Sequence, residues 1–533
     1  MWGYYQKMSS DNKLLFNQLK SLLFLPPQAK HFIKWAKSTF KFSGNKIQGE
    51  LLLDVKPNFR YILQSVLFSD YFYRVASLKP KLIVPCGEGF ASKVRSIFFN
   101  VTPLGRLHRS FGATSGLRYF NISFSSKFKK ESMKIFSELE NKRDLLNLHF
   151  EDIPIGDLIY DSYLRVYSVT TVDLKDMRLK NLICSALEIV QRCKNYLNTH
   201  DVKLVLLSHA VYIEYGLIAR CAAFRGIDVY VVGHIWGTPI RGKITKDHFL
   251  QTVDHYQYPT IFNSLANKEN RLESAKIMLK NRFTGVIDSS IAYMKNSAYG
   301  ENNKSDKNIF LKSDKKRILI MLHCFFDSPH IYKSMVFEDF YEWIYFTLSK
   351  IDYQSYDVYV KPHPNGLVGN EPIIRDLEQN FKLAKFIDKQ VSNSQILKES
   401  LDCVITVCGT VGHEFAYHDI PVITAGDNPH SAYNFCKEAK TKEEYLNLVN
   451  SVGGSLPIEI NKSEIEEFFY MHYLYVEDEA IKGASDLFKC SASMDKSRQY
   501  DPEILSEFTA DFDKSIFKEF DSKAQIIFDN FCS

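Results

Sequence analysis

The sequence has no pair of cysteines in the C-x-x-C spacing, no long apolar run and little net charge. Its ten cysteines are scattered, and several lie inside apolar segments, where cysteine behaves as a small hydrophobic residue. This distribution argues against a zinc site and fits a protein kept in a reducing compartment.

The sequence also shows no pattern typical of a membrane span or of an export signal. No stretch approaches the roughly 18 apolar residues of a membrane span, and the first residues, MWGYYQK, lack the charged-then-apolar pattern of a signal peptide. We therefore expect a cytoplasmic protein, with peripheral contact at the inner membrane left open. Residues 14–41 mix aromatic residues with lysines, a pattern that also suits ordinary amphipathic packing helices.

Charge and length narrow the class of protein further. The 67 basic and 62 acidic residues nearly balance, giving a formal net charge of +5, so nucleic-acid binding has little support. With 45% apolar and 24% charged residues the composition is typical of a globular protein. A chain of 533 residues is too long for one hydrophobic core, which predicts at least two domains.

Apolar, β-branched runs alternate with helical segments in both halves of the chain. Residues 1–80 are expected to be mostly helical. Strands are predicted after that point at 80–86, 202–207, 227–232, 317–322, 357–361, 403–407 and 421–424, with helices at 91–98, 212–224 and 335–350. Strands that alternate with helices form parallel sheets covered on both faces.

The predicted fold class is therefore α/β, with two Rossmann-like domains facing across a cleft. The polar stretch that ends at residue 316 has the composition of a linker. We expect an N-terminal domain at 1–300 with a helical extension at its start, a linker at 301–316, a C-terminal domain at 317–470 and a helical tail at 471–533.

The most informative motif lies at residues 402–414, where a buried strand gives way to a Gly-Thr-x-Gly turn and a helix. A helix start after a small-residue turn is an anion site, because unpaired amides and the positive end of the helix dipole point at the ligand. Gly409 and Thr410 supply the turn, and Glu414 can accept from a sugar hydroxyl. Lys361 and His363 add donors from a neighbouring loop. Together they predict a nucleotide phosphate site without a Walker loop.

Other polar residues follow predicted strands where open α/β sheets bind ligands, at the carboxyl ends of the strands. His323 and Asp327 follow the strand at 317–322, and Pro364 completes the His-Pro pair after the strand at 357–361. Structural alternatives stay open. His363 can be a turn residue fixed by prolines, and His323 and Asp327 can serve hydrogen bonds within their own loop.

These motifs resemble the GT-B glycosyltransferases of bacterial capsule and lipopolysaccharide synthesis. The nearest subset uses CMP-activated acidic sugars, as Kdo transferases and bacterial sialyltransferases do. The resemblance rests on Lys-Pro-His-Pro at 361–364 and on Gly-Thr-x-Gly at 409–412, and it covers about residues 315–450. It implies that both motifs hold the nucleotide phosphate in the C-terminal domain. The acidic motif of the sialyltransferases, two carboxylates followed by glycine, is missing.

The catalytic residue is less well defined by the sequence. Glu88, which lies between two glycines after the strand at 80–86, is one candidate for a base or nucleophile, and His209, after the strand at 202–207, is the other. Glu214 and His234 carry lower weight. Three arginines in a loop-like segment could hold an anionic group, although a solvated basic loop also explains them: Arg106, Arg109 and Arg118.

The predicted activity is transfer of a sugar from a nucleotide donor to a cell-surface polysaccharide or lipid-linked glycan, with no metal and no cofactor. The only Asp-x-Asp, at 511–513, is best explained as a solvated helix face. Two alternatives stay open. One is a different enzyme on this fold, a nucleotide-sugar 2-epimerase or a polyol-phosphate transferase, and the other is a non-catalytic module of polysaccharide assembly.

Overall fold

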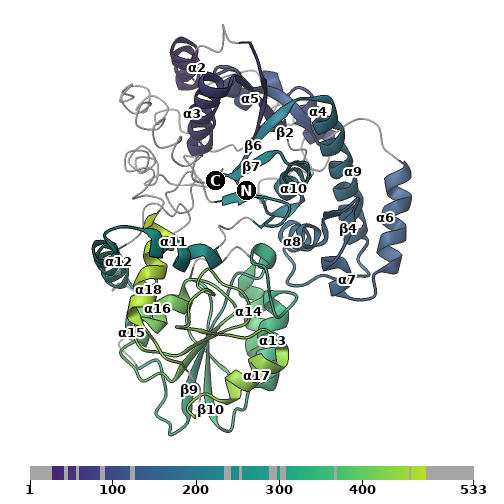
Figure 1. Ribbon diagram of the computed structural model, residues 1–533. Helices are drawn as coiled ribbons and strands as arrows, with labels where there is room; N and C mark the ends of the chain where they lie inside the picture. Colours follow the sequence, from purple (N-terminus) through teal and green to yellow (C-terminus); the bar gives the residue numbers. More distant parts are fainter. Residues whose placement is uncertain are drawn as a thin grey trace.

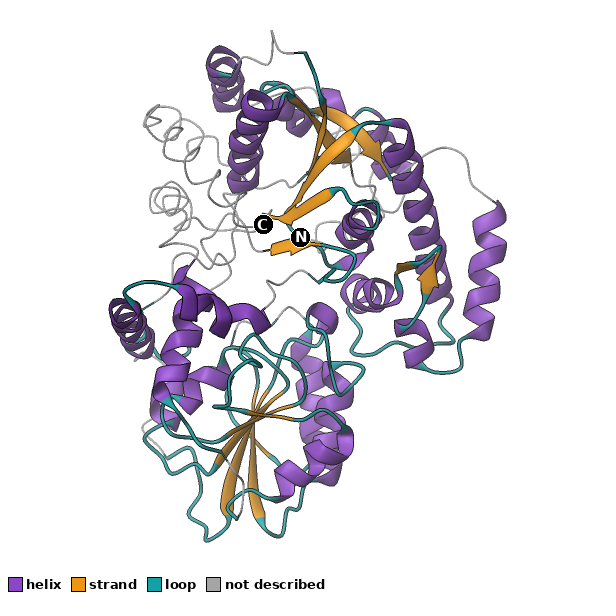
Figure 2. Ribbon diagram, in the orientation of Figure 1, coloured by secondary structure: helices purple, strands orange, loops and turns teal. Residues whose placement is uncertain are grey.

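In this computed structural model, the chain forms two α/β units, drawn in Figures 1 and 2. The structure describes residues 27–40, 46–55, 59–84, 90–119, 126–232, 242–250, 255–286, 297–300, 308–364, 366, 369–454 and 458–475. Each unit contains a six-stranded sheet with helices on both faces. The predicted fold class, two Rossmann-like domains, is confirmed.

The N-terminal sheet has the strand order β3-β2-β1-β6-β7-β8, and its pairs are parallel apart from the antiparallel pair β7–β8. Its strands are β1 (Gly49–Asp54), β2 (Leu78–Val84), β3 (Thr114–Arg118), β6 (Val202–Leu207), β7 (Asp228–Val231) and β8 (Gly242–Ile244). A short antiparallel pair, β4 (His149–Phe150) and β5 (Ile153–Pro154), lies apart from this sheet.

The C-terminal sheet has the order β11-β10-β9-β12-β13-β14, with all its pairs parallel. Its strands are β9 (Lys316–Met321), β10 (Tyr356–Lys361), β11 (Lys385–Phe386), β12 (Cys403–Thr406), β13 (Val422–Thr424) and β14 (Lys437–Glu438). Both sheets therefore follow the same 3-2-1-4-5-6 pattern, which is the strand order of dinucleotide-binding folds.

Alternate side chains of a strand point to opposite faces of its sheet. In both sheets, helices cover each face and bury both sets of side chains. In β9, Ile318 and Ile320 pack in one cluster with helices α13, α14 and α17, while Leu319 and Met321 pack in another with α16 and α18. These helices are α13 (Phe340–Lys350), α14 (Asn370–Asn380), α16 (Val411–Ala416), α17 (Lys442–Asn450) and α18 (Lys462–Phe469). A strand buried on both faces is apolar throughout, which is why the sequence predicted β9 so well.

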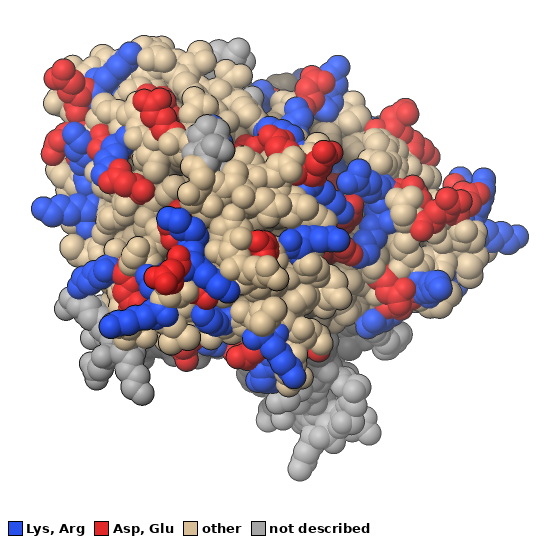
Figure 3. Space-filling view, turned by 90° about the horizontal axis from the view of Figure 1, so that it is seen from below, with Lys and Arg blue, Asp and Glu red and all other residues tan. Residues whose placement is uncertain are grey.

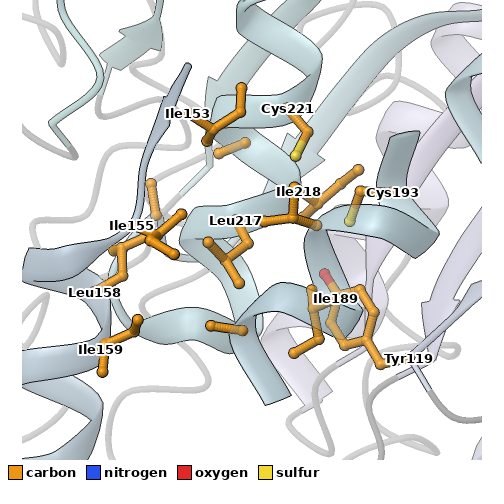
Figure 4. Close-up of a cluster of buried hydrophobic side chains, with 14 of the residues drawn as sticks. Tyr119, Ile153, Ile155, Leu158, Ile159, Ile189, Cys193, Leu217, Ile218 and Cys221 are labelled. Atoms are coloured by element: carbon orange, nitrogen blue, oxygen red, sulfur yellow. The ribbon is translucent and has the colours of Figure 1, made fainter. Parts of the chain in front are cut away.

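The N-terminal sheet is covered in the same way by two helical groups. One face packs against α2 (Pro27–Thr39), α3 (Phe59–Ala76) and α5 (Pro103–Arg109). The other packs against α6 (Ser126–Glu138), α7 (Lys142–Leu146), α8 (Gly156–Tyr167), α9 (Met177–Thr199) and α10 (Leu217–Ala223). Figure 4 shows part of this second cluster, with Ile218 of α10 beside Cys193 of α9.

Three local predictions need correction. The expected helical start of the chain contains β1, a central strand, because its run of three leucines between Gly49 and Asp54 is buried on both sheet faces. The arginine-bearing segment expected as a loop holds α5 and β3. The helix expected from residue 335 begins at Phe340, because Asp339 accepts a hydrogen bond from the amide of Glu342 (2.8 Å) and caps it there.

Helices α11 (Tyr258–Ser264) and α12 (Lys268–Phe283) pack on the C-terminal unit, although the predicted boundaries place them in the N-terminal domain. Figure 1 shows both beside α18. His255 bonds Asp427 (2.9 Å) and Arg282 bonds Glu414, so buried polar contacts reinforce this packing. Residues 301–307 of the predicted linker, and the predicted tail beyond residue 475, lie outside the described residues.

Basic and acidic side chains are interspersed on the face of the molecule seen in Figure 3, as the nearly balanced composition leads one to expect. Among the described residues, no helix combines the length and apolar character needed to cross a membrane.

Candidate active site

The switch point of the C-terminal sheet lies between β9 and β12, the two neighbours whose crossovers leave in opposite directions. Open α/β sheets bind ligands outside the carboxyl ends of the strands at such a point. His323 follows β9, and its Nε2 lies 2.7 Å from the carbonyl oxygen of Cys408, which follows β12. Since a carbonyl only accepts, Nε2 carries the proton. Burial lowers the pKa of His323, so the ring is neutral at pH 7.

His363 follows β10, on the other side of β9, and its ring centroid lies 6.2 Å from that of His323. Pro364, half-buried, continues directly into a turn. Burial is the main cause that lowers the pKa of His363 to about 4, and the neighbouring His323 and Lys361 act in the same direction. At pH 7 the ring would therefore act as a neutral hydrogen-bond donor toward an anion.

The Gly-Thr turn after β12 lies against His323. Gly409 has φ +112°, and a Cβ there would approach His323 Nε2 to 2.9 Å, so only glycine fits without displacing the ring. Its amide donates to Asn428 Oδ1 (2.9 Å) and is therefore engaged within the protein. Thr410 is half-buried at the start of the six-residue α16, and its side chain does not cap that helix. The predicted strand–turn–helix is confirmed, and its use as a phosphate cradle stays a prediction.

Asn428 has no counterpart in the sequence-based site. It is fully buried in the loop after β13, and its Nδ2 donates to the carbonyl of Gly426 (2.8 Å) while its Oδ1 fixes Gly409. The signal available in the sequence was the Gly-Asp-Asn triplet at 426–428, one residue after the strand at 421–424. Asn428 therefore holds the turn that the sequence analysis identified.

Glu414 is 3% exposed and pairs with Arg282 of α12. Oε1 accepts from Arg282 Nε (2.8 Å) and Nη2 (2.6 Å), while Oε2 accepts from the hydroxyl of Tyr299 (3.0 Å). The carboxylate thus holds α12 against α16. Its predicted contact with a sugar hydroxyl stays a prediction.

Lys361, the last residue of β10, is 1% exposed, and within the described part of the chain its Nζ has no hydrogen-bond partner. Burial lowers the pKa of this amine to about 8, although the negative charges of Glu414 and Asp388 favour the protonated form. A buried cation without a partner is costly and unusual in a native protein. An anionic ligand at the neighbouring switch point would supply the missing acceptor.

The N-terminal sheet has its own switch point, between β1 and β6. Asp54 ends β1, and Ser208 and His209 follow β6. The backbone amide and the hydroxyl of Ser208 both donate to the carboxylate of Asp54, and Ser208 Oγ lies 3.0 Å from His209 Nδ1. Asp54 escaped the sequence analysis because its strand was taken for helix.

The remaining candidates from the sequence are dispersed. Glu88 and His234 lie outside the described residues. Glu214 belongs to the π-helical turn η3 (Tyr212–Gly216), and its charge acts on Tyr119 and Tyr215, as that of Asp54 does. Arg106, Arg109 and Arg118 are exposed, on α5 and β3.

One contact links the two switch points. The hydroxyl of Tyr212, three residues after His209, donates to Asp327 Oδ1 (3.3 Å) in the loop that begins at His323. Asp327 itself is exposed and also accepts from the amide of Ser328 (3.0 Å). The candidate residues of the two domains therefore adjoin one junction. Among the described residues, no group of three or more His, Cys, Asp or Glu side chains is arranged to hold a metal ion.

The sequence matches no protein-family model and no curated protein. Among solved structures it is similar to KpsC, a beta Kdo 2,4 transferase of Thermosulfurimonas dismutans, at 16% identity and a TM-score of 0.31, covering 52% of this chain and 81% of that one. It is also similar to the UDP-GlcNAc 2-epimerase of Neisseria meningitidis (10% identity, TM-score 0.21, 83% and 98% covered). It is similar as well to a glycosyltransferase of Rickettsia africae, at 11% identity and a TM-score of 0.27, covering 87% of this chain and 100% of that one. These similarities are low, so a functional assignment has to rest on the residues of the site.

Proposed function

We propose that this protein is a glycosyltransferase that holds a nucleotide sugar at the C-terminal switch point and passes its sugar to a hydroxyl acceptor at the N-terminal one. One observation carries the proposal. The rings of two neutral histidines, His323 and His363, have centroids 6.2 Å apart beside a glycine-dependent turn, next to the buried amine of Lys361, which has no hydrogen-bond partner among the described residues. The carbonyl of Cys408 already takes the ring proton of His323, so the donors left for a ligand are His363, Lys361 and the Thr410 hydroxyl, a set that suits a phosphate.

The chemistry asked of these residues is stabilisation of a departing phosphate. Negative charge grows on the phosphate oxygens as the bond to the anomeric carbon breaks, and fixed donors in a buried site stabilise that charge strongly. His363 would donate through its ring, and Lys361 would become fully protonated as the anion arrives. The Thr410 hydroxyl adds a third donor from the start of α16.

The proposed donor and acceptor follow from the sequence motifs. The motifs at 361–364 and 409–412 support a CMP-activated acidic sugar such as Kdo or sialic acid. The acceptor would be a growing surface polysaccharide or a lipid-linked glycan, which would bring the protein to the inner membrane surface from the cytoplasm. We propose that no metal ion takes part.

Calorimetric titration with CMP, UDP and GDP tests the proposal. We expect one of the three to bind the wild-type chain and to bind His363→Ala about tenfold more weakly, the loss of one hydrogen bond to a charged group. His418→Ala is the matched control, because His418 is exposed in the same domain and packs on Phe283. Binding of none of the three nucleotides, or equal affinity in His363→Ala and wild type, would refute the proposal.

A further inference from the structure

A chain of hydrogen bonds crosses the N-terminal switch point from Asp54 through Ser208 to His209. Asp54 is 8% exposed and Ser208 is 2% exposed, whereas the ring of His209 is half-buried. The two buried members therefore lie beneath the histidine and position it from the protein side.

The available protons fix the direction of this chain. An ionised carboxylate only accepts, and Ser208 has a single O–H. That hydroxyl donates to Asp54 Oδ2, and the Ser208 amide donates to Oδ1 (3.1 Å). Ser208 Oγ therefore has only lone pairs left for His209 Nδ1, 3.0 Å away, and must accept from it. The proton of the neutral ring lies on Nδ1, so Nε2 carries the lone pair of a base.

We propose that His209 is the general base of the transfer reaction and that Asp54 and Ser208 are its positioning residues; this inference rests on the proposed function. The proton of the acceptor hydroxyl passes to Nε2 as the acceptor oxygen bonds to the anomeric carbon. The bond from that carbon to the phosphate oxygen breaks, and its electron pair leaves with the nucleotide. The resulting imidazolium, stabilised through Ser208 by the charge of Asp54, later returns its proton to water.

His209 suits this role better than the carboxylate beneath it. Both oxygens of Asp54 already accept from Ser208, and Asp54 is almost fully covered, so an acceptor has no open approach to it. His209 is half-buried, and Tyr212 connects its segment to the loop after His323. The proposed base, Nε2 of His209, thus belongs to the N-terminal domain, and its segment contacts the loop at the proposed donor site.

Other titratable groups surround the chain and enter its pH dependence. Tyr215 lies with its ring centroid 6.0 Å from that of His209. Burial is the main cause that raises the pKa of Tyr215 and of Tyr119 well above the usual value, and the charges of Glu214 and Asp54 act in the same direction on both phenols. Both phenols therefore stay neutral around pH 7, and the nearby charges on η3 and β1 are the carboxylates.

The tautomer can be measured without any substrate, by ¹⁵N NMR of the full chain labelled at histidine, with the His209 signals assigned through His209→Gln. We expect the Nδ1–H tautomer in the wild type. In Asp54→Asn the new amide can donate to Ser208 Oγ, which turns the Ser208 hydroxyl toward Nδ1 and moves the ring proton to Nε2. Asp201→Asn, an exposed carboxylate just before β6, is the control and should leave the tautomer unchanged.

Catalysis is tested by release of nucleotide from CMP-, UDP- and GDP-sugars with water as the acceptor. His209→Gln and Asp54→Asn should each lower turnover about 10² to 10⁴-fold, as loss of a general base does. The acidic limb of the wild-type pH profile should also disappear in His209→Gln. Nucleotide affinity should stay unchanged, because both residues lie in the other domain.

The outcomes separate the two proposals. If the wild type binds no nucleotide, the proposed transferase function is refuted. The tautomer of His209 still shows in that case whether the hydrogen bonds from Asp54 through Ser208 to His209 exist. An Nε2–H tautomer in the wild type overturns the inference. So does turnover by His209→Gln at the wild-type rate with the wild-type pH profile.

Discussion

The buried amine of Lys361 should lower the free energy of unfolding, and this effect can be measured separately from nucleotide binding. Its folded-state pKa of about 8 lies below the ordinary value of 10.5. Between those pH values the unfolded chain holds a proton that the folded chain has lost, so stability rises with pH across this window. Below pH 8 the penalty is fully present, about 3 kcal/mol at roughly 1.4 kcal/mol per pKa unit.

Lys361→Met should therefore stabilise the protein by about 3 kcal/mol at pH 7, with the gain shrinking toward pH 10. Urea denaturation of both proteins between pH 7 and 10 measures the difference. Lys382→Met, at an exposed lysine of the same domain, should show no such gain. If Lys361 serves a phosphate, the same variant should bind the nucleotide at least tenfold more weakly. A variant that is no more stable than wild type at pH 7 would contradict the burial penalty.

Single residues were predictable where they follow apolar strands. His323 and His363 stand two residues after the ends of β9 and β10, whose apolar segments, Ile-Leu-Ile-Met and Val-Tyr-Val, mark strands buried on both faces. Asp54 and Asn428 were missed for different reasons. Asp54 ends a strand whose short Leu-Leu-Leu core suits helix equally well. Asn428 acts through the folding of a loop onto Gly409, a long-range contact that no local pattern encodes.

At the level of elements, the turn after β12 depends on its glycine. Gly409→Ala would combine an unfavourable positive φ with displacement of His323, whereas Gly226→Ala has a positive φ and no atom within 4 Å of the new Cβ. Each substitution should cost about 1–2 kcal/mol from the backbone. Only Gly409→Ala should also weaken nucleotide binding, by about tenfold. Thermal melting measures the stability of the two variants, and calorimetry measures their nucleotide affinity. Equal nucleotide affinity in both variants would show that the position of His323 does not matter for nucleotide binding.

Helix α12 is held to the C-terminal unit by the buried pair of Arg282 and Glu414. Arg282→Met would leave the Glu414 carboxylate buried without its partner, at a cost of about 3–5 kcal/mol. Adding Glu414→Gln should recover part of the loss. Lys276→Met changes a half-exposed lysine of the same helix and should cost at most about 1 kcal/mol. Denaturant unfolding gives these differences, and a loss in Arg282→Met no larger than in the control would mean that α12 is held by its apolar contacts alone.

Element types were predictable where a run is almost wholly apolar, as in β12 and in β6, whose one charged residue is the exposed Lys203. Packing partners were not. The sequence assigned residues 255–283 to the N-terminal domain by proximity in the chain. In the structure, Tyr258, Phe262 and Leu279 join the core of the C-terminal unit. Chain order does not determine which of two adjacent cores an amphipathic helix covers, because both offer apolar surface.

At the scale of the whole molecule, buried polar contacts join the domains. His330 Nδ1 lies 2.5 Å from Asp161 of α8, and the hydroxyl of Tyr160 donates to Asp339 (2.6 Å). Burial is the main cause that raises the pKa of Asp161 to about 6, while the carboxylates around His330, Asp161 foremost, outweigh burial and raise the pKa of the histidine.

Both shifts make the interface less stable as pH rises. The folded state binds more protons than the unfolded state between pH 4 and 6 through Asp161, and above pH 6.5 through His330. The stability of the wild type relative to Asp161→Asn/His330→Gln should therefore fall steadily from pH 4 to pH 8. Chemical denaturation at each pH measures that difference. A difference independent of pH would show that the pair does not titrate as proposed.

The central claim is that a nucleotide phosphate binds at the switch point of the C-terminal sheet, and a crystal structure of the protein soaked with CMP, UDP or GDP tests it most directly. We predict phosphate density within hydrogen-bond distance of the His363 ring and the Thr410 hydroxyl, with the Lys361 ammonium turned toward it. Nucleotide density elsewhere on the molecule, with these three side chains unmoved and distant from it, would contradict the proposed site.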